Sequence, residues 1–234
     1  MTTAAVITAA GLGTRLGADL PKALVEVAGQ PLISWALDRI ADVTDTVIVT
    51  APPGHLAEFS RAIAPVAIGR PRLDVRVVAG GETRRASVAA GLAALVEAAP
   101  EASIVLVHDA ARAFMPVAAM REAIGAVEAG ADGAIPIVPL VDTLVSAPGE
   151  DGELGAVVDR DLIRAAQTPQ VFRAEALRDA HERADREGDG GATDDAALVR
   201  RAGYRVVATE GHPWGFKVTV TGDLALAEHV ARQA

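Results

Sequence analysis

Apolar residues along this chain follow two alternating patterns, short continuous runs and stripes at helical spacing. Residues 4–10 form an apolar run with β-branched residues at 6–8, which is typical of a strand buried on both faces. From Pro31 to Ile40, apolar residues recur every three or four positions, and this spacing predicts a helix. The chain therefore begins with a strand, a connecting loop and a helix.

The same alternation continues toward the end of the chain. Further strands are expected at 46–50, 75–78, 104–107, 132–138, 204–209 and 215–220. Further helices are expected through Ile63, from Val88 to Val96, over 174–186 and 194–201, and from Asp223 onward. Strands that alternate with helices are typical of βαβ units, so the pattern predicts an α/β fold with a mostly parallel sheet and helices on both faces.

One stretch departs from this pattern. Residues 139–145 alternate between apolar and polar, 148–155 form a polar turn, and 156–160 are again apolar before a charged pair. This predicts a β-hairpin arm, at about 139–164, that projects from the sheet. Because an isolated hairpin cannot bury its own faces, the arm needs a second surface. No repeat or linker interrupts the rest, and we expect 1–234 to form a single domain.

The loop after the first strand carries the strongest chemical signal. It contains Gly11, Gly13 and Gly17, and it also carries Arg15 and Lys22. Glycines at such a place let backbone N–H groups approach an anionic phosphate closely. The spacing matches neither a P-loop nor a dinucleotide-binding motif, and an ordinary turn with two solvated cations explains the residues about equally well.

Two further observations favour phosphate chemistry. Of the 22 basic residues only Lys22 and Lys217 are lysines, and a compact ammonium can follow a moving phosphoryl group. The fourth strand is followed by Asp109 and then by Arg112, an arrangement that suits a metal–phosphate site. Taken alone, that acid is better explained as a helix cap. The loop at 80–87 also follows a strand, at the edge where ligands bind in open α/β sheets.

Composition narrows the function classes. Hydrophobic residues make up 50% of the 234 residues and aromatic residues only 3%, so one core of aliphatic side chains is expected. The absence of cysteine excludes disulfides and thiolate metal sites and fits a cytoplasmic protein. The net charge of −9 argues against nucleic-acid binding, and no apolar run predicts a membrane span or signal peptide. A small anionic substrate remains compatible with cations gathered locally.

Taken in order, these segments resemble the 2-C-methyl-D-erythritol 4-phosphate cytidylyltransferase family along nearly the whole chain. The motifs that carry the resemblance are 9–15 with 21–22, 80–84 with Ser87, 108–112, 142–143, 158–160, 168–170, 193–195 and 216–219. The resemblance implies a Rossmann-like nucleotidyltransferase sheet. It also implies a reaction in which the phosphate of methylerythritol phosphate attacks the α-phosphorus of CTP, with Mg²⁺, to give CDP-methylerythritol and pyrophosphate.

The resemblance also implies roles for individual residues. Arg15, Lys22 and Lys217 would be the catalytic cations, and Asp109 would hold the metal. The nucleotide would be bound by Ala9, Ala10, Gly11, Gly13, Gly81, Glu82, Ser87 and Ala110. The sugar phosphate would be bound by Asp109, Arg112, Thr143, Arg160, Thr168 and Thr193. In this family the arm crosses a homodimer, so Thr143 and Arg160 are expected to serve the neighbouring subunit.

Phosphate chemistry agrees with this interpretation. A phosphate monoester is largely dianionic at neutral pH because its second pKa is about 6, so the nucleophile needs no general base. The histidines are accordingly expected to be structural or surface residues. Two alternatives stay open: a cytidylyltransferase that acts on ribitol phosphate, and a regulatory protein that binds a nucleotide without turnover.

Overall fold

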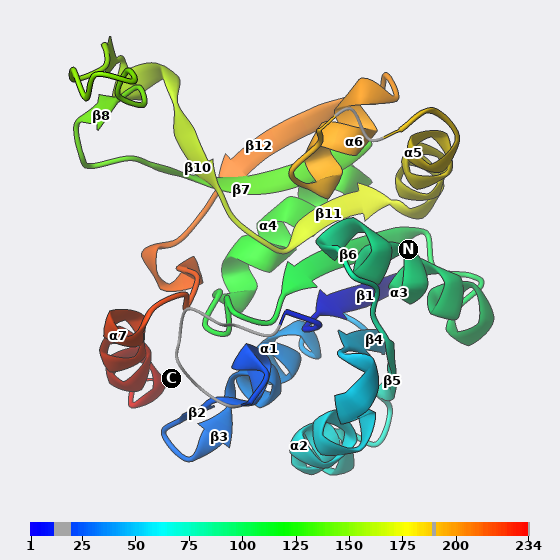
Figure 1. The fold of residues 1–234 in the computed structure, drawn as a ribbon. Coiled ribbons are helices and arrows are strands. Elements are labelled where there is room, and N and C mark those ends of the chain that lie inside the picture. Colours follow the sequence, from blue (N-terminus) through cyan, green and yellow to red (C-terminus); the bar gives the residue numbers. More distant parts are fainter. Residues whose placement is uncertain (12–19, 189–190, 234) are drawn as a thin grey trace.

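The computed structural model describes residues 1–11, 20–188 and 191–233. Within these ranges, eight strands form one central sheet in the order β10-β7-β11-β6-β1-β4-β5, with β12 paired to β7 (Figure 1). The neighbours β6, β1, β4 and β5 are parallel, as are β7 and β12, whereas β10 and β11 run antiparallel to their partners. The strands are β1 (Thr3–Thr8), β4 (Thr46–Ala51), β5 (Asp74–Ala79), β6 (Ile104–Asp109), β7 (Gly133–Pro139), β10 (Arg164–Ala166), β11 (Gln170–Arg173) and β12 (Val206–Glu210).

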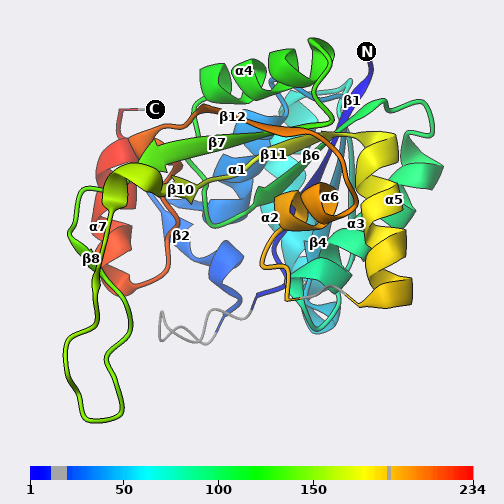
Figure 2. The same ribbon diagram turned by 90° about the horizontal axis from the view of Figure 1, so that it is seen from above.

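Helices cover both faces of the sheet, and each face has its own apolar core. One face packs against α1 (Leu32–Ile40), α2 (Leu56–Gly69) and α4 (Val117–Glu128). The other packs against α3 (Arg84–Ala98), α5 (Ala174–Glu187) and α6 (Asp195–Arg201), and Figure 2 shows α4 and α5 on opposite sides. The predicted fold class is therefore confirmed. Among the described residues, no helix combines the length and the hydropathy that crossing a bilayer requires.

A third, smaller cluster of apolar side chains lies beside this sheet. It joins α7 (Thr221–Ala231), which is the predicted closing helix, to the short pair β2 (Glu26–Val27) and β3 (Gln30–Pro31). Trp35, Phe114 and Phe216 also pack there, with the rings of Trp35 and Phe114 centred 5.5 Å apart. Short 3₁₀ turns lie at Lys22–Leu24, Pro53–His55, Arg160–Leu162 and Pro213–Gly215. This cluster attaches the C-terminal part of the chain beside β1.

Three sequence expectations need correction. Residues 215–220 do not form a strand, because this segment lies outside the sheet and its Val218 N–H donates to the Ala111 carbonyl. The helix α4 was not expected from the sequence, because half of its buried positions are alanines, which give a weak apolar stripe. Val96 was expected on the buried face of α3 but is 49% exposed.

The projecting arm is present, with a shorter ladder than its sequence pattern predicts. The end of β7 pairs with β10, and beyond them β8 (Leu144–Val145) pairs with β9 (Val157–Val158). The arm extends away from the sheet in both ribbon views (Figures 1 and 2). Its exposed apolar side chains are Val141, Val145, Leu154, Val157 and Leu162. None of the residues that the structure describes covers these side chains.

The packing of α3 against the sheet depends on one glycine. A methyl group placed on Gly91 would contact both branches of Val6 and would lie 3.3 Å from the side chain of Thr50. Val6 is fully buried at the centre of β1, and a β-branched side chain has little rotational freedom with which to move aside. Gly91 therefore sets how closely α3 approaches the strands that end at the cavity described below.

We expect Gly91→Ala to destabilise the protein by about 1–3 kcal/mol, because overpacking exceeds the gain in helix propensity. The matched control is Gly125→Ala in α4, where an added methyl group meets nothing within 4 Å. That control should stabilise the protein by about 0.5–1 kcal/mol. Urea unfolding of both variants measures the effects, and a Gly91→Ala variant as stable as the control would contradict the close-packing argument.

Candidate active site

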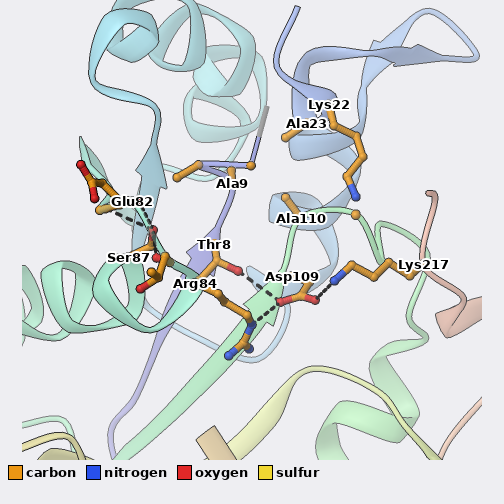
Figure 3. Close-up of a pocket in the computed structure, with 15 residues that line it drawn as sticks. Thr8, Ala9, Lys22, Ala23, Glu82, Arg84, Ser87, Asp109, Ala110 and Lys217 are labelled. Carbon is orange, nitrogen blue, oxygen red and sulfur yellow. Dashed lines mark hydrogen bonds and ion pairs between the residues drawn. The ribbon is translucent and has the colours of Figure 1, made fainter. Parts of the chain in front are cut away.

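A cavity of about 200 Å³ opens at the carboxyl ends of β1 and β6 (Figure 3). Parallel strands bring their carboxyl ends to one edge of a sheet, which is where open α/β folds bind ligands. Three loops and one distant segment contribute its walls. The lining residues are Thr8, Ala9, Ala10, Gly11, Lys22, Ala23, Gly81, Glu82, Thr83, Arg84, Ser87, Asp109, Ala110, Ala111 and Lys217.

Asp109, the last residue of β6, lies at the centre of this site. Thr8 is its register partner on β1, and the Thr8 hydroxyl donates to Asp109 Oδ1 over 3.2 Å. Arg84 Nε donates to the same oxygen over 3.0 Å, and Lys217 Nζ lies 2.7 Å from Oδ2. Figure 3 shows Arg84 and Lys217 approaching the carboxylate from opposite sides. One carboxylate is thus held between two cations that are far apart in the sequence.

These cations decide the charge state of the carboxylate. Burial by itself would raise the pKa of Asp109, but the charges of Arg84 and Lys217 and their hydrogen bonds outweigh it and hold that pKa well below its usual range. The pKa of Arg84 is raised in turn, because Asp195 and Asp109 outweigh the effect of its burial. Asp109 is therefore an ionised acceptor at neutral pH.

The loop between β5 and α3 forms the second wall. Its Thr83 hydroxyl accepts the Ala86 N–H over 3.0 Å and caps α3, while Ser87 Oγ accepts the Gly81 N–H over 3.2 Å. A methyl group on Gly80 would lie 2.7 Å from the side chain of Ala10, so the loop can rest against the end of β1 only because this residue is glycine. Ser87 thus shapes the loop as well as lining the cavity.

Lys217 reaches the cavity through the corrected segment at 215–220. The Val218 N–H donates to Ala111 O over 2.9 Å, next to the end of β6. One nitrogen of Arg112 donates to Gly215 O over 2.7 Å, and another donates to Ala166 O over 3.1 Å. The guanidinium of Arg112 therefore stabilises the turn that precedes Lys217. Arg112 is not among the residues that line the cavity.

Thr168 is buried beneath Asp109. Its hydroxyl accepts the backbone N–H of Asp109 over 3.0 Å and lies 3.1 Å from His108 Nδ1. Burial lowers the pKa of His108 to about 4, so the ring that contacts the Thr168 hydroxyl is a neutral imidazole at neutral pH. Thr168 and His108 thereby fix the backbone at the end of β6.

The structure brings ten of the predicted site residues to the cavity and leaves five outside its lining. Thr143 and Arg160 lie exposed on the arm, where Arg160 donates to Val141 O over 2.6 Å. Thr193 lines a neighbouring cavity, separated from the first by Thr83 and Arg84. The residues that line the main cavity are Ala9, Ala10, Gly11, Lys22, Gly81, Glu82, Ser87, Asp109, Ala110 and Lys217, and those outside it are Arg112, Thr143, Arg160, Thr168 and Thr193. Gly13 and Arg15 lie outside the described residues.

Known proteins resemble this chain along nearly its whole length. A family model described as IspD: 2-C-methyl-D-erythritol 4-phosphate cytidylyltransferase matches residues 3–233. A protein of that name from Saccharopolyspora erythraea is 43% identical over 232 residues, which is 98% of this chain and 99% of the relative. The chain belongs to the 2-C-methyl-D-erythritol 4-phosphate cytidylyltransferase family.

Solved structures and fused relatives extend the likeness. The crystal structure of 2-C-methyl-D-erythritol 4-phosphate cytidylyltransferase from Thermus thermophilus is 39% identical with a TM-score of 0.80, covering 99% of this chain and all of that one. A bifunctional enzyme IspD/IspF from Clavibacter michiganensis is 46% identical over 98% of this chain and 54% of its own length. The protein is thus a nucleotidyltransferase of this family.

Three residues that line the cavity, Thr8, Ala23 and Arg84, were not expected there from the sequence. Arg84 lies within the motif at 80–84, yet its sequence neighbours do not indicate that its partners are Asp109 and Asp195, 25 and 111 positions away. One local feature of the sequence does bear on its position. Thr83 is a typical helix N-cap, and this places Arg84 at the first position of a helix that follows a strand. Its partners follow only from the tertiary structure.

His108 should make the stability of this cytidylyltransferase depend on pH. Its pKa is about 6.5 in the unfolded chain and about 4 in the folded protein. As the pH falls, His108 is therefore protonated in the unfolded chain before it is protonated in the folded protein. The contribution of neutral His108 to the free energy of unfolding is complete above about pH 6.5 and is lost progressively toward pH 4. His108→Asn, which retains a hydrogen-bond partner for Thr168, should show a smaller loss in urea unfolding between pH 7 and pH 4. An equally steep decline in the variant would contradict this assignment.

Proposed function

We propose that the cavity binds CTP and that the phosphate of 2-C-methyl-D-erythritol 4-phosphate attacks its α-phosphorus there. One P–O bond forms between the acceptor phosphate and the α-phosphorus. The bond from the α-phosphorus to the oxygen that bridges to the β-phosphorus breaks, and pyrophosphate leaves with that electron pair. The observation that carries this proposal is the ionised Asp109, held 2.7 Å from Lys217 in a cavity that Lys22 also lines.

The nucleotide would be held mainly by backbone and small side chains. Ala9, Ala10 and Gly11 line one side of the cavity, and Gly81, Glu82 and Ser87 line the other. Backbone groups and short side chains of this kind suit close contact with a flat pyrimidine base and its ribose. By the family resemblance, Gly13 and Ala110 would complete the nucleotide contacts.

The lysines would act on the triphosphate. As negative charge redistributes in the transition state, preorganised cations stabilise it more than they stabilise the ground state. Lys22 and Lys217 approach the cavity from different segments, and Figure 3 shows both ammonium groups directed toward the space in front of Asp109. By the family resemblance Arg15 would supply a third cation.

Asp109 fits a Mg²⁺ ion that arrives with the nucleotide. Among the described residues no group of three potential metal ligands is present, so these residues form no cage for a metal ion by themselves. Mg²⁺ at nucleotide sites commonly takes one or two carboxylates and completes its coordination with phosphate oxygens and waters, which is the donor set that Asp109 and a triphosphate provide. When bound, the ion would neutralise charge on the phosphates, while the lysines orient them.

The acceptor phosphate needs no base from this chain. It is largely dianionic at neutral pH, with a second pKa of about 6. His108, which is adjacent to Asp109, is fully buried and its pKa is lowered by that burial, so it serves the backbone geometry and does not shuttle protons. Orientation of two polyanions therefore supplies the main contribution from the protein.

The acceptor would be bound by residues around the cavity and by residues of a second subunit. Arg112, Thr168 and Thr193 lie behind or beside the cavity, consistent with a role in shaping the acceptor side. Thr143 and Arg160 lie on the projecting arm, which carries uncovered apolar side chains. We propose that residues 1–234 form one domain that dimerises through the arm at about 139–164, with these two residues completing the neighbour's site.

The decisive measurement is pyrophosphate release with a panel of nucleotides and acceptors. We expect CTP with methylerythritol phosphate to be preferred over UTP or ATP, because hydrogen bonds to the exocyclic amine of cytosine separate CTP from UTP and the lining of the cavity suits a pyrimidine base. Comparable kcat/KM for UTP or ATP would contradict the nucleotide assignment. Faster turnover with ribitol phosphate would reassign the acceptor, and CTP binding without turnover of either acceptor would indicate a regulatory protein.

The shared site can be tested by mixing two inactive variants, Lys22→Ala and Arg160→Ala, under conditions that exchange subunits. In a mixed dimer one site collects both defects and the other collects neither, so activity should return to about one quarter of wild type at equal mixing. The control pairs Lys22→Ala with Lys217→Ala, where every mixed site keeps one defect and no activity should return. A first mixture that stays as inactive as this control would contradict action in trans.

A further inference from the structure

The side chain of Arg84 bridges two buried carboxylates that belong to different elements. Its Nε lies 3.0 Å from Asp109 Oδ1, and one terminal nitrogen lies 2.6 Å from Asp195 Oδ2. Asp109 lines the main cavity, whereas Asp195, the first residue of α6, lines the neighbouring one. Arg84 therefore forms part of the partition between the two cavities and connects α6 to the reacting centre.

Asp195 is itself held from the other side. His181 on α5 approaches it with Nε2 2.8 Å from Oδ1, and both side chains are almost fully buried. Although burial raises the pKa of Asp195, the hydrogen bond from His181 and the charge of Arg84 outweigh it and lower that pKa overall. An ionised carboxylate can only accept, so His181 carries its proton on Nε2. Asp195 is thus fixed in orientation and in charge.

This arrangement limits what Arg84 can do at Asp109. A guanidinium commonly meets a carboxylate with two parallel N–H bonds, which would engage both oxygens. Here one terminal nitrogen is occupied by Asp195, the other is buried with no partner among the described residues, and only Nε reaches Asp109. Asp109 Oδ2 is left to Lys217.

The cost of this arrangement argues for a function. Burying an ion pair is expensive, and well-packed apolar residues are often as stabilising as a buried pair. The unpartnered nitrogen of Arg84 adds to that cost, since a two-bond pairing with Asp109 would satisfy it. The arrangement thus leaves one Arg84 nitrogen without a hydrogen bond while it pairs the arginine with both acids.

We propose that Asp195, held by His181, is a positioning residue that draws Arg84 away from a two-bond pairing with Asp109. By doing so it leaves Asp109 Oδ2 available to Lys217, which is thereby held at the cavity where the phosphates would bind. The effect on turnover rests on the proposed function, whereas the effect on the orientation of Arg84 does not. The two can therefore be tested separately.

A double-mutant cycle tests the effect on turnover. We expect Asp195→Ala to lower kcat by about 10–100-fold, as loss of a partner behind a site residue commonly does, with a much smaller change in the KM for CTP. Because Asp195 acts through Arg84, adding Asp195→Ala to an Arg84→Ala variant should change kcat by less than about twofold. Losses that multiply in the double variant would overturn the proposal.

The matched control is Asp179→Ala on α5, the helix that carries His181. Asp179 also accepts from an arginine and a second donor, Arg183 and Tyr204, both at 2.9 Å, and it lines neither cavity. It should retain wild-type kcat. Thermal unfolding of every variant ensures that kcat is compared between folded proteins, and an equal loss in the control would overturn the assignment to Asp195.

Two variants of His181 give a second route that leaves Asp195 intact. His181→Gln can place an amide nitrogen near the position of Nε2 and so keep the bond to Asp195, whereas His181→Leu cannot. We expect the glutamine variant to retain most of kcat and the leucine variant to lose part of it. Equal kcat in both variants would overturn the role given to His181, whether or not Asp195→Ala folds.

A crystal structure of Asp195→Ala without substrates gives a readout that does not depend on activity. We expect two nitrogens of Arg84 within hydrogen-bond distance of Asp109, and Lys217 Nζ displaced from Oδ2. An Arg84 that keeps its wild-type orientation would overturn the inference even in an active enzyme. If wild-type protein instead released no pyrophosphate from CTP with either polyol phosphate, the proposed function would fail while this structural result could still hold.

Discussion

The structure depends on keeping one negative charge, that of Asp109, in a place where little water reaches it. A buried carboxylate costs several kcal/mol unless partners compensate for the lost hydration. The partners here are Arg84 and Lys217, which lie 25 and 108 positions away in the sequence. The fold must therefore place the first turn of α3 and the segment before α7 next to the end of β6.

The parallel sheet meets this requirement through register. Thr8 and Asp109 face each other where β1 and β6 end, so the loops that follow both strands share one edge. Apolar cores on both faces hold the sheet rigid, and Gly91 lets α3 approach closely enough for its first turn to face Asp109. The third cluster then brings the segment before α7 to the same edge, with Val218 buried and Lys217 beside the cavity.

Global and local charge have opposite signs in this protein. The chain carries a net charge of −9, yet the cavity is lined by three cations, Lys22, Arg84 and Lys217, against two carboxylates, those of Glu82 and Asp109. Interactions between exposed charges are screened within about 8 Å at physiological salt, so a polyanionic substrate responds mainly to the cations near it. This local excess of positive charge explains how an acidic protein can bind a nucleoside triphosphate and a second phosphate together.

The amino-acid sequence by itself indicated the parallel strands of the sheet, most helices, the glycine-rich loops and the family, because these depend on local periodicity and on motifs in order. The family resemblance then indicated ten of the residues that line the cavity. Only the tertiary structure decided that Thr168 turns inward to the backbone of Asp109 and that Arg112 binds two carbonyl groups. The tertiary structure also decided the partners of Arg84 and the path of residues 215–220. Both depend on which distant segments are brought together by sheet register and helix packing. A side chain with five donors, such as arginine, takes whichever acceptors the fold brings within about 3 Å, and its neighbours in sequence do not determine that choice.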